Sequence, residues 1–255
     1  LHGERVPNLP DATGTISGLR PGSFAPGVIF RAALEGITAS IVIEIAGDLA
    51  IETRAQTLGR FDLLAADECF LTGTHIATPE GETRVEELKI GDEILTAAGE
   101  AIAIRWIGVQ RVYTAFRPPE RLRPVRVSAG ALGDGLPKRD LRLTADHALV
   151  VDGLLINAGA LVNGASIDWA SAEEMGEFYT VYHIETENHE EILAEGTPAE
   201  TYIDYIGRSH FHNYSEYVAL YGEERTIAEM DRPRISTPRL VPAAIRARLA
   251  ADKAA

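Results

Sequence analysis

Tight-turn signals divide the apolar part of this chain into short segments that are rich in β-branched residues. Asp152-Gly153 separates the apolar residues 148–151 from residues 154–156, and Asp-Gly between two such runs is a strong signal for a two-residue hairpin. A second hairpin signal, Pro79-Glu80-Gly81, follows an apolar strand pattern near residue 70. Segments this short favour strands over helices. The sequence therefore predicts an all-β fold.

The remaining elements follow from the same reading. Residues 85–88 predict a short helical turn that ends at Gly91-Asp92, and residues 242–251, with Pro at the start and Ile245 and Leu249 four apart, predict a C-terminal helix. We expect further strands at 70–77, 83–85, 93–96, 101–109, 141–143, 178–185 and 190–194, and several more within 29–64.

Charge excludes two classes of partner. The 255 residues carry 24 Lys and Arg against 38 Asp and Glu, which gives a formal net charge of −14. A strongly acidic chain is a poor match for nucleic acid or for an anionic membrane surface. The apolar runs are broken within a few residues, so the sequence predicts no membrane span. With 45% hydrophobic residues, the chain can still bury a full core.

The charges are unevenly distributed along the chain. Residues 171–200 hold nine acidic residues and no Lys or Arg, whereas residues 231–255 hold six Arg or Lys against two Asp. A basic tail attached to an acidic body favours packing of the tail against that body, although an exposed arm is the alternative. The acidic run itself lacks the alternating pattern of a calcium-binding loop, which favours a solvated face.

The cysteine count limits the kinds of site that the chain can build. Cys69 is the single cysteine, which excludes an intrachain disulfide framework and any metal site made of several cysteines. His183, His189, His210 and His212 do not follow a regular ligand spacing. We therefore expect neither a metal nor another cofactor.

Two segments could carry chemistry. Cys69 lies where a loop enters a strand, and Thr144 and His147 bracket a turn between two strands. A Thr and a His three residues apart can converge on one peptide group, where the hydroxyl forms hydrogen bonds and the imidazole exchanges a proton. The simpler interpretations are a small buried cysteine and a hairpin corner with a satisfied histidine. Asp146 either orients His147 or only caps the turn.

Several stretches together resemble a known family. They are residues 69–78 (Cys-Phe-Leu-Thr-Gly-Thr-His-Ile-Ala-Thr), 85–96, the Thr-x-x-His of 144–147, and 189–202, with a Gly-rich stretch at 129–137. In this order they resemble a bacterial Hint domain, the fold shared by hedgehog autoprocessing domains and inteins. The resemblance covers about residues 69–205 and implies a horseshoe-like all-β fold of long hairpins. The short basic helix at the C-terminal end also recurs in that subgroup.

The resemblance implies a self-processing reaction. The sulfur of Cys69 would attack the carbonyl carbon of Glu68 and convert the peptide into a thioester by an N-to-S acyl shift. His147 would protonate the leaving nitrogen and Thr144 would hold the peptide. His189 or His183 would act as a further base, with His189 preferred because it opens the closing motif.

Departures from the family pattern favour cleavage over splicing. An intein ends in His-Asn followed by Cys, Ser or Thr, whereas the only His-Asn pair here, at His212, is followed by Tyr214, a weak nucleophile at neutral pH. Thr201 stands where animal hedgehog domains carry a second cysteine. The chain is therefore predicted to be of the hedgehog type, without a relay between two thiols. Water or an external amine, thiol or alcohol would resolve the thioester.

These observations predict three parts. Residues 1–68 would be a β-rich upstream segment, either the tail of a passenger or an adaptor that presents Glu68. Residues 69–205 would be the Hint domain, and residues 206–255 an extension that ends in the basic helix. The substrate would be the chain's own N-terminal flank, processed in a single turnover. The alternatives are a Hint-fold module that does not cleave and serves a structural or adhesive role, and a thiol hydrolase acting in trans. The chain begins at Leu1 without Met, so we expect a piece of a longer protein, and the resemblance implies an exported multidomain one.

Overall fold

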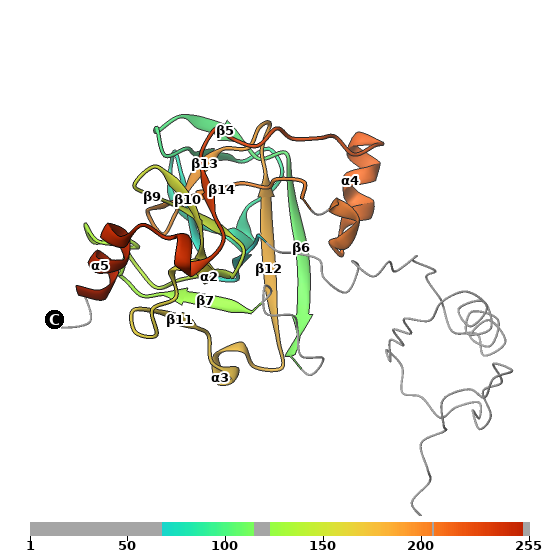
Figure 1. Ribbon diagram of the computed structural model, residues 1–255. Coiled ribbons are helices and arrows are strands. Elements are labelled where there is room, and N and C mark those ends of the chain that lie inside the picture. The colour runs from blue at the N-terminus through green and yellow to red at the C-terminus, as the bar shows by residue number, and fades with distance from the viewer. Residues whose placement is uncertain (1–67, 115–122, 206, 252–255) are drawn as a thin grey trace, which may run out of the picture. The chain divides into compact units, whose positions relative to one another are not determined.

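The computed structural model describes residues 68–114, 123–205 and 207–251, and Figure 1 shows how their strands and helices are arranged. The strands expected within residues 29–64 and the upstream segment 1–67 lie outside these residues.

The described residues are mostly β structure, as the sequence predicts. The strands are β1 (Phe70–Leu71), β2 (His75–Thr78), β3 (Gly81–Arg84), β4 (Glu93–Leu95), β5 (Ala101–Ala103), β6 (Trp106–Tyr113), β7 (Pro124–Val127), β8 (Leu141–Thr144), β9 (Ala148–Val151), β10 (Leu154–Asn157), β11 (Ile167–Trp169), β12 (Phe178–Glu185), β13 (Glu191–Ala194), β14 (Thr197–Glu200) and β15 (Arg234–Ile235). The helices are α2 (Ala158–Leu161), α3 (Ala172–Met175), α4 (Tyr214–Tyr221) and α5 (Ala243–Ala251), with 3-10 turns η2 (Val85–Glu87), η5 (Arg208–His210) and η6 (Pro238–Leu240).

The described strands form two larger sheets and a small one. The first sheet has the order β11-β7-β8-β1-β12-β6, the second has the order β15-β10-β9-β14-β13-β2-β3, and β4 pairs with β5. The long pair β6 and β12, which stands upright in Figure 1, is antiparallel over eight residues on each strand. Strand β12 occupies the range expected from the sequence, and it pairs with β1 on one side and with β6 on the other.

The strand expected at residues 70–77 is in fact two strands in different sheets. Strand β1 joins the first sheet and β2 joins the second, with a turn between them in which the Thr74 N–H donates to the Leu71 carbonyl at 3.2 Å. Gly73 adopts φ 90° in that turn, a conformation that glycine reaches without a steric penalty. The chain thus crosses between the sheets directly after Cys69-Phe70-Leu71.

The Asp152-Gly153 hairpin is confirmed. Strand β9 pairs with β10 in antiparallel register, and Asp152 and Gly153 adopt φ of 51° and 78°. Two central residues with positive φ are the signature of the type I′ turn, whose twist matches that of the flanking strands. This hairpin leads from His147 back across the second sheet.

The basic tail packs against the acidic body, as the charge distribution predicts. Strand β15 adds to the second sheet by pairing in parallel with β10. Helix α5 buries Ile245 and Leu249 in the larger hydrophobic core, and Arg248 donates two hydrogen bonds of 3.0 Å to the carboxylate of Asp152. Burial of two apolar side chains four residues apart explains why this short helix forms here.

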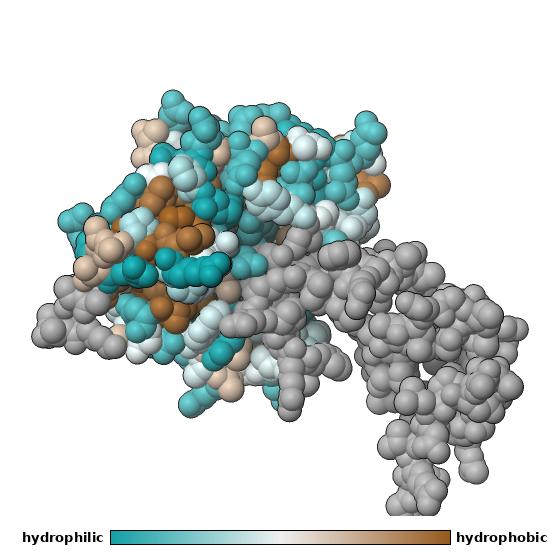
Figure 2. Space-filling model, viewed as in Figure 1, coloured by the Kyte–Doolittle hydropathy of each residue, from teal (hydrophilic) through white to brown (hydrophobic). Residues whose placement is uncertain are grey.

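Two hydrophobic clusters fill the interior of the described part of the chain. The larger cluster lies among the strands of both large sheets. The smaller cluster contains Cys69, Leu71, Trp106, Val112, Tyr179, Val181, Tyr202, Ile203, Phe211, Tyr217 and Ile227. Apolar side chains also gather on the surface beside α5, as Figure 2 shows. Within the described residues, no helix combines the length and the apolar character that a membrane crossing requires.

Candidate functional site

Cys69 lies directly before β1 and is completely buried. Its neighbours in the smaller cluster are apolar and aromatic, and they include Trp106 and Tyr202. Strand β1 is only two residues long but is paired on both sides, with Tyr182 and Leu143 both opposite Phe70. This central position in a sheet fixes the backbone that carries Cys69.

Thr144 binds the backbone of Cys69 through two groups. The Cys69 N–H donates to Thr144 Oγ1 at 2.8 Å, and the Thr144 N–H donates to the Cys69 carbonyl at 2.9 Å. The second bond follows from the antiparallel pairing of β1 with β8, which ends at Thr144. The first bond places a hydroxyl on the nitrogen of the Glu68–Cys69 peptide.

His147 follows in the same turn and is completely buried. Its ring packs against that of Phe70 with the centroids 4.2 Å apart. Among the described residues, neither ring nitrogen has a hydrogen-bond partner. Burial lowers the pKa of His147 to about 4, against the opposing charge of Glu200. The imidazole is therefore neutral at pH 7, and a buried, unsatisfied histidine of this kind needs an explanation.

His183 supplies a second imidazole beside the first. It lies on β12, is buried, and has its ring centroid 6.0 Å from that of His147 and 4.8 Å from that of Tyr202. Burial lowers the pKa of His183 well below its ordinary value, and the charge of a protonated His147 would lower it further. The structure thus brings Cys69, Thr144, His147 and His183 into one region.

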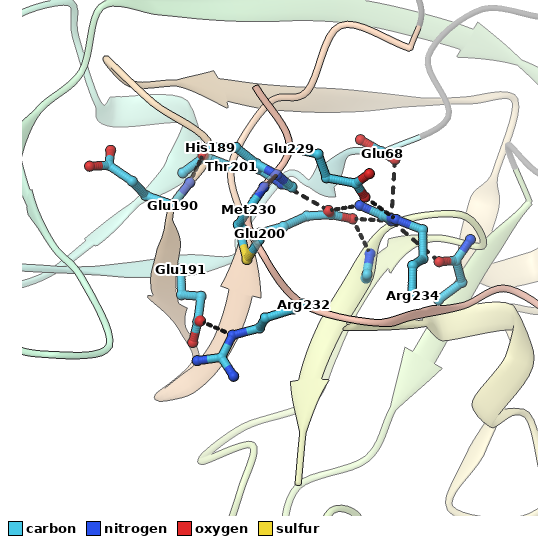
Figure 3. Close-up of polar contacts among 12 residues, drawn as sticks. Glu68, His189, Glu190, Glu191, Glu200, Thr201, Glu229, Met230, Arg232 and Arg234 are labelled. Carbon is cyan, nitrogen blue, oxygen red and sulfur yellow. Dashed lines mark hydrogen bonds and ion pairs between the residues drawn. The ribbon is translucent and has the colours of Figure 1, made fainter. Parts of the chain in front are cut away.

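His189 differs because partners occupy both of its ring nitrogens (Figure 3). The Met230 N–H donates to Nδ1 at 3.1 Å, and Nε2 lies 3.0 Å from a carboxylate oxygen of Glu200. Since Nδ1 accepts, the proton must be on Nε2 and is donated to Glu200. His189 is therefore held in a single tautomer and orientation.

Glu200 is the central group of this polar network. It is completely buried and accepts from the Ala148 N–H at 2.6 Å, from His189, and from Arg234 Nη1 at 3.1 Å. Burial would raise the pKa of Glu200, but the hydrogen bonds from His189 and Arg234 outweigh it and hold the pKa at about 2. Because Ala148 follows His147, this carboxylate also positions the turn that carries His147.

Arg234 connects the network to Glu68. Its Nη1 lies 3.5 Å from Glu68 Oε1, and its Nε donates to Glu229 at 3.0 Å. Burial alone would lower the pKa of Arg234, but Glu200, together with Glu68 and Glu229, outweighs it and raises the pKa further, so the guanidinium is always charged. Neither Glu200 nor Arg234 was predicted as a site residue from the sequence. Glu200 lies within the closing motif, whereas Arg234 is one of several basic residues in the tail, and no local pattern distinguishes it.

Three further residues from the sequence analysis have other surroundings. Asp146 is half-buried, and the ring nitrogens of His147 take no hydrogen bond from it or from any other described residue. Thr201 is buried, and its hydroxyl accepts from the Glu190 N–H at 2.9 Å. The side chain of Asn213 bridges to β6, accepting from the Val109 N–H at 2.9 Å and donating to the Ile107 carbonyl at 2.8 Å.

The described residues contain no group of three His, Cys, Asp or Glu side chains placed to hold a metal ion. The site instead combines the thiol of Cys69, a peptide nitrogen that Thr144 orients, and two neutral imidazoles whose ring centroids lie 6.0 Å apart. Chemically, this set can form and break an acyl–sulfur bond with proton transfer.

Comparison with known proteins gives one family. The model of the Hint domain family matches residues 68–205, which is more than half of the chain. Among solved structures, the MchDnaB-1 intein is similar with 19% identity and a TM-score of 0.39 over 51% of this chain and 98% of that one. An intein-like domain from Clostridium thermocellum is 17% identical, with a TM-score of 0.39 over 53% and 99%. A DnaB intein from Synechocystis is 10% identical, with a TM-score of 0.35 over 53% and 100%. No curated protein sequence matches the chain.

Proposed function

We propose that this chain, which belongs to the Hint domain family, cleaves itself at the Glu68–Cys69 peptide through a thioester and does not splice. The Hint fold implies a capacity for autoprocessing in general. The observation that carries the specific proposal is the hydrogen bond of 2.8 Å from the Cys69 N–H to Thr144 Oγ1, beside a buried His147 whose ring nitrogens have no partner among the described residues.

The first step is an isomerisation. The sulfur of Cys69 bonds to the carbonyl carbon of Glu68, the carbon–nitrogen bond breaks, and the thiol proton ends on the nitrogen of Cys69. The thioester is less stable than the amide, so protonation of the departing nitrogen is needed to drive the step. Attacking and attacked atoms belong to adjacent residues, which gives a large advantage from proximity.

His147 is the proposed carrier of that proton. It is neutral at pH 7 because burial lowers its pKa to about 4. A neutral ring can accept the thiol proton, and an imidazolium with so low a pKa is a strong acid toward the amine nitrogen. Thr144 positions the nitrogen by accepting its N–H.

We assign the role of further base to His183, although the order of motifs in the sequence favours His189. The ring of His183 lies 6.0 Å from that of His147, whereas both nitrogens of His189 already have partners. His189 contributes to the site by fixing Glu200 and, through it, the backbone after His147. Its proposed role is therefore positioning.

Two features support cleavage over splicing. Cys69 is the single thiol, and the hydroxyl of Thr201 is engaged with the Glu190 N–H. Asn213 would have to cyclise to release a downstream segment, but its amide nitrogen donates to Ile107 and to Glu216. Water or a small nucleophile then releases residues 1–68, the tail of a passenger, from the domain proposed to begin at Cys69. The β module that does not cleave remains the alternative for the test.

Intact mass spectrometry of the freshly purified chain tests the proposal. We expect hydroxylamine to split the chain into a fragment that ends in a hydroxamate at Glu68 and a fragment that begins at Cys69. Hydroxylamine attacks thioesters much faster than amides, which makes the adduct diagnostic. Samples incubated in buffer alone and with dithiothreitol identify the acceptors that the site admits. A chain that keeps its full mass under all three conditions would support the β module that does not cleave.

Replacing Thr144 by valine should slow hydroxylamine cleavage by about tenfold or more, because the Cys69 N–H loses its buried acceptor at a cost of about 1–3 kcal/mol. Thr197→Val is the matched control. Thr197 is also buried, and its hydroxyl has no hydrogen-bond partner among the described residues. Its replacement should leave the rate within about twofold. Equal rates for both variants, measured by mass spectrometry over time, would remove Thr144 from the mechanism.

A further inference from the structure

Arg234 comes from a part of the chain that lies beyond the matched residues 68–205, yet it contacts the residue at the proposed cleavage site. Strand β15 carries it along the edge of β10, and Figure 3 shows its guanidinium between Glu68 and Glu200. A segment outside the family match thus contributes to the surroundings of the Glu68–Cys69 peptide.

The carboxylate of Glu68 is enclosed. Its side chain is 8% exposed and that of Arg234 is 18% exposed, with Nη1 3.5 Å from Oε1. A carboxylate removed from water is costly unless a cation or hydrogen-bond donors compensate it. Arg234 provides that compensation, and its own position is fixed independently by Glu200 and Glu229. The cationic group therefore stays in place whatever side chain stands at position 68.

These contacts make position 68 selective for an acidic side chain. A neutral amide there would lose the ionic part of the contact, and a lysine would place a second cation against Arg234 in a site with little access to water. Glu68 is also the residue whose carbonyl carbon the sulfur of Cys69 would attack. Binding of its side chain therefore determines how that carbonyl is presented to the sulfur.

We propose that Arg234 is a specificity-determining residue that selects an acidic side chain immediately before Cys69 and thereby positions the carbonyl for attack. The inference rests on the proposed cleavage and names the class of flanking polypeptide that the domain processes, namely one that ends in an acidic residue.

Cleavage rates of variants at positions 68 and 234 test the inference. Hydroxylamine cleavage should fall about tenfold in Glu68→Gln and about a hundredfold in Glu68→Lys. In the Arg234→Lys background, which retains a cation for Glu200, the further loss caused by Glu68→Gln should shrink to less than threefold, because lysine lacks the planar fork that reaches several carboxylates. An unchanged tenfold loss in that background would overturn the inference.

The matched control is the neighbouring ion pair between Arg232 and Glu191, which Figure 3 also shows. Arg232→Lys and Glu191→Gln change the same residue types, with Arg232 two residues from Arg234 and Glu191 on β13, but neither residue pairs with Glu68. Both should leave the cleavage rate and the preference for Glu68 unchanged. A loss as large as that of Glu68→Gln would attribute the effect to general charge and would also overturn the inference.

A stability measurement separates the inference from the proposed function. In the Cys69→Ala background, which cannot form a thioester, urea unfolding of Glu68→Gln, Arg234→Lys and the double variant gives the coupling between the two residues. We expect the shifts in urea midpoint of the two single variants, added together, to be clearly larger than the shift in urea midpoint of the double variant. Additive shifts would overturn the inference even if the chain cleaves. If the two residues are coupled but the chain with Cys69 intact never cleaves, the proposed function is overturned. The role of Arg234 as a specificity-determining residue is then overturned as well.

Discussion

Cys69→Ala should abolish fragment formation under every nucleophile, while the wild-type chain gives the fragment that ends at Glu68. Alanine has no sulfur to accept the acyl group, and Cys69 is the single cysteine, so no other thiol can replace it. The expected effect is therefore complete loss. Intact mass spectrometry with hydroxylamine and with dithiothreitol measures it, because residual cleavage appears as new masses.

A packing control is needed because Cys69 is completely buried. Val181 lies in the same hydrophobic cluster on β12 and is equally buried. Val181→Ala removes more volume from the same cluster but keeps the sulfur, at a cost of about 1–3 kcal/mol in stability. This variant should still cleave. If Cys69→Ala still cleaves, the thiol is not the nucleophile. If both variants fail to cleave, disturbed packing alone explains the loss.

His147→Gln should reduce the cleavage rate by about a hundredfold to ten-thousandfold, which is the usual contribution of a positioned proton-transfer group. Glutamine keeps a polar side chain of similar reach but cannot carry the proton between sulfur and nitrogen. His75→Gln is the matched control, because His75 pairs with Glu195 at 2.9 Å and an amide can keep that hydrogen bond. Time courses with hydroxylamine should distinguish the two variants clearly, and equal rates would contradict the assignment.

The same variant gives a second readout that does not depend on cleavage. The unfolded chain protonates His147 near pH 6.5, whereas burial in the folded chain lowers its pKa to about 4. Between these values the unfolded state binds more protons, so this residue makes stability rise with pH by about 3 kcal/mol in total. Unfolding of the wild-type chain from pH 4 to 6.5 should show this rise, and His147→Gln should show a smaller one. If the stabilities of the wild-type chain and of His147→Gln change in parallel with pH, burial does not lower the pKa of His147, and its imidazole is in contact with water.

Local patterns were sufficient to predict most of the β structure. The Asp152-Gly153 turn and β12 could be placed because the turn needs positive φ and the strand needs a run of β-branched and aromatic residues. The single strand expected at residues 70–77 was wrong, since the turn at Gly73 sends its two halves into different sheets. Strand order in a sheet depends on contacts far apart in sequence, which no local pattern contains.

The candidate site was likewise only partly predictable from the sequence. Cys69, Thr144 and His147 could be proposed because their spacing and order match motifs, and the structure brings them together. Neither spacing nor residue type ranks His183 above His189. That choice depends on the partners of each ring nitrogen. Arg234 could not be proposed at all, because only the parallel pairing of β15 with β10 brings a tail residue to Glu68.

The buried carboxylate of Glu200 has a practical consequence for moving this module to another protein. It ties together the backbone after His147, the hairpin that carries His189, and the tail segment that carries Arg234. A transplant cut at residue 205, where the family match ends, would leave that carboxylate without its guanidinium. Removing one partner of a buried ion pair costs about 3–5 kcal/mol, a large share of the stability of an ordinary domain. The portable unit for protein engineering therefore extends at least through β15, which carries Arg234.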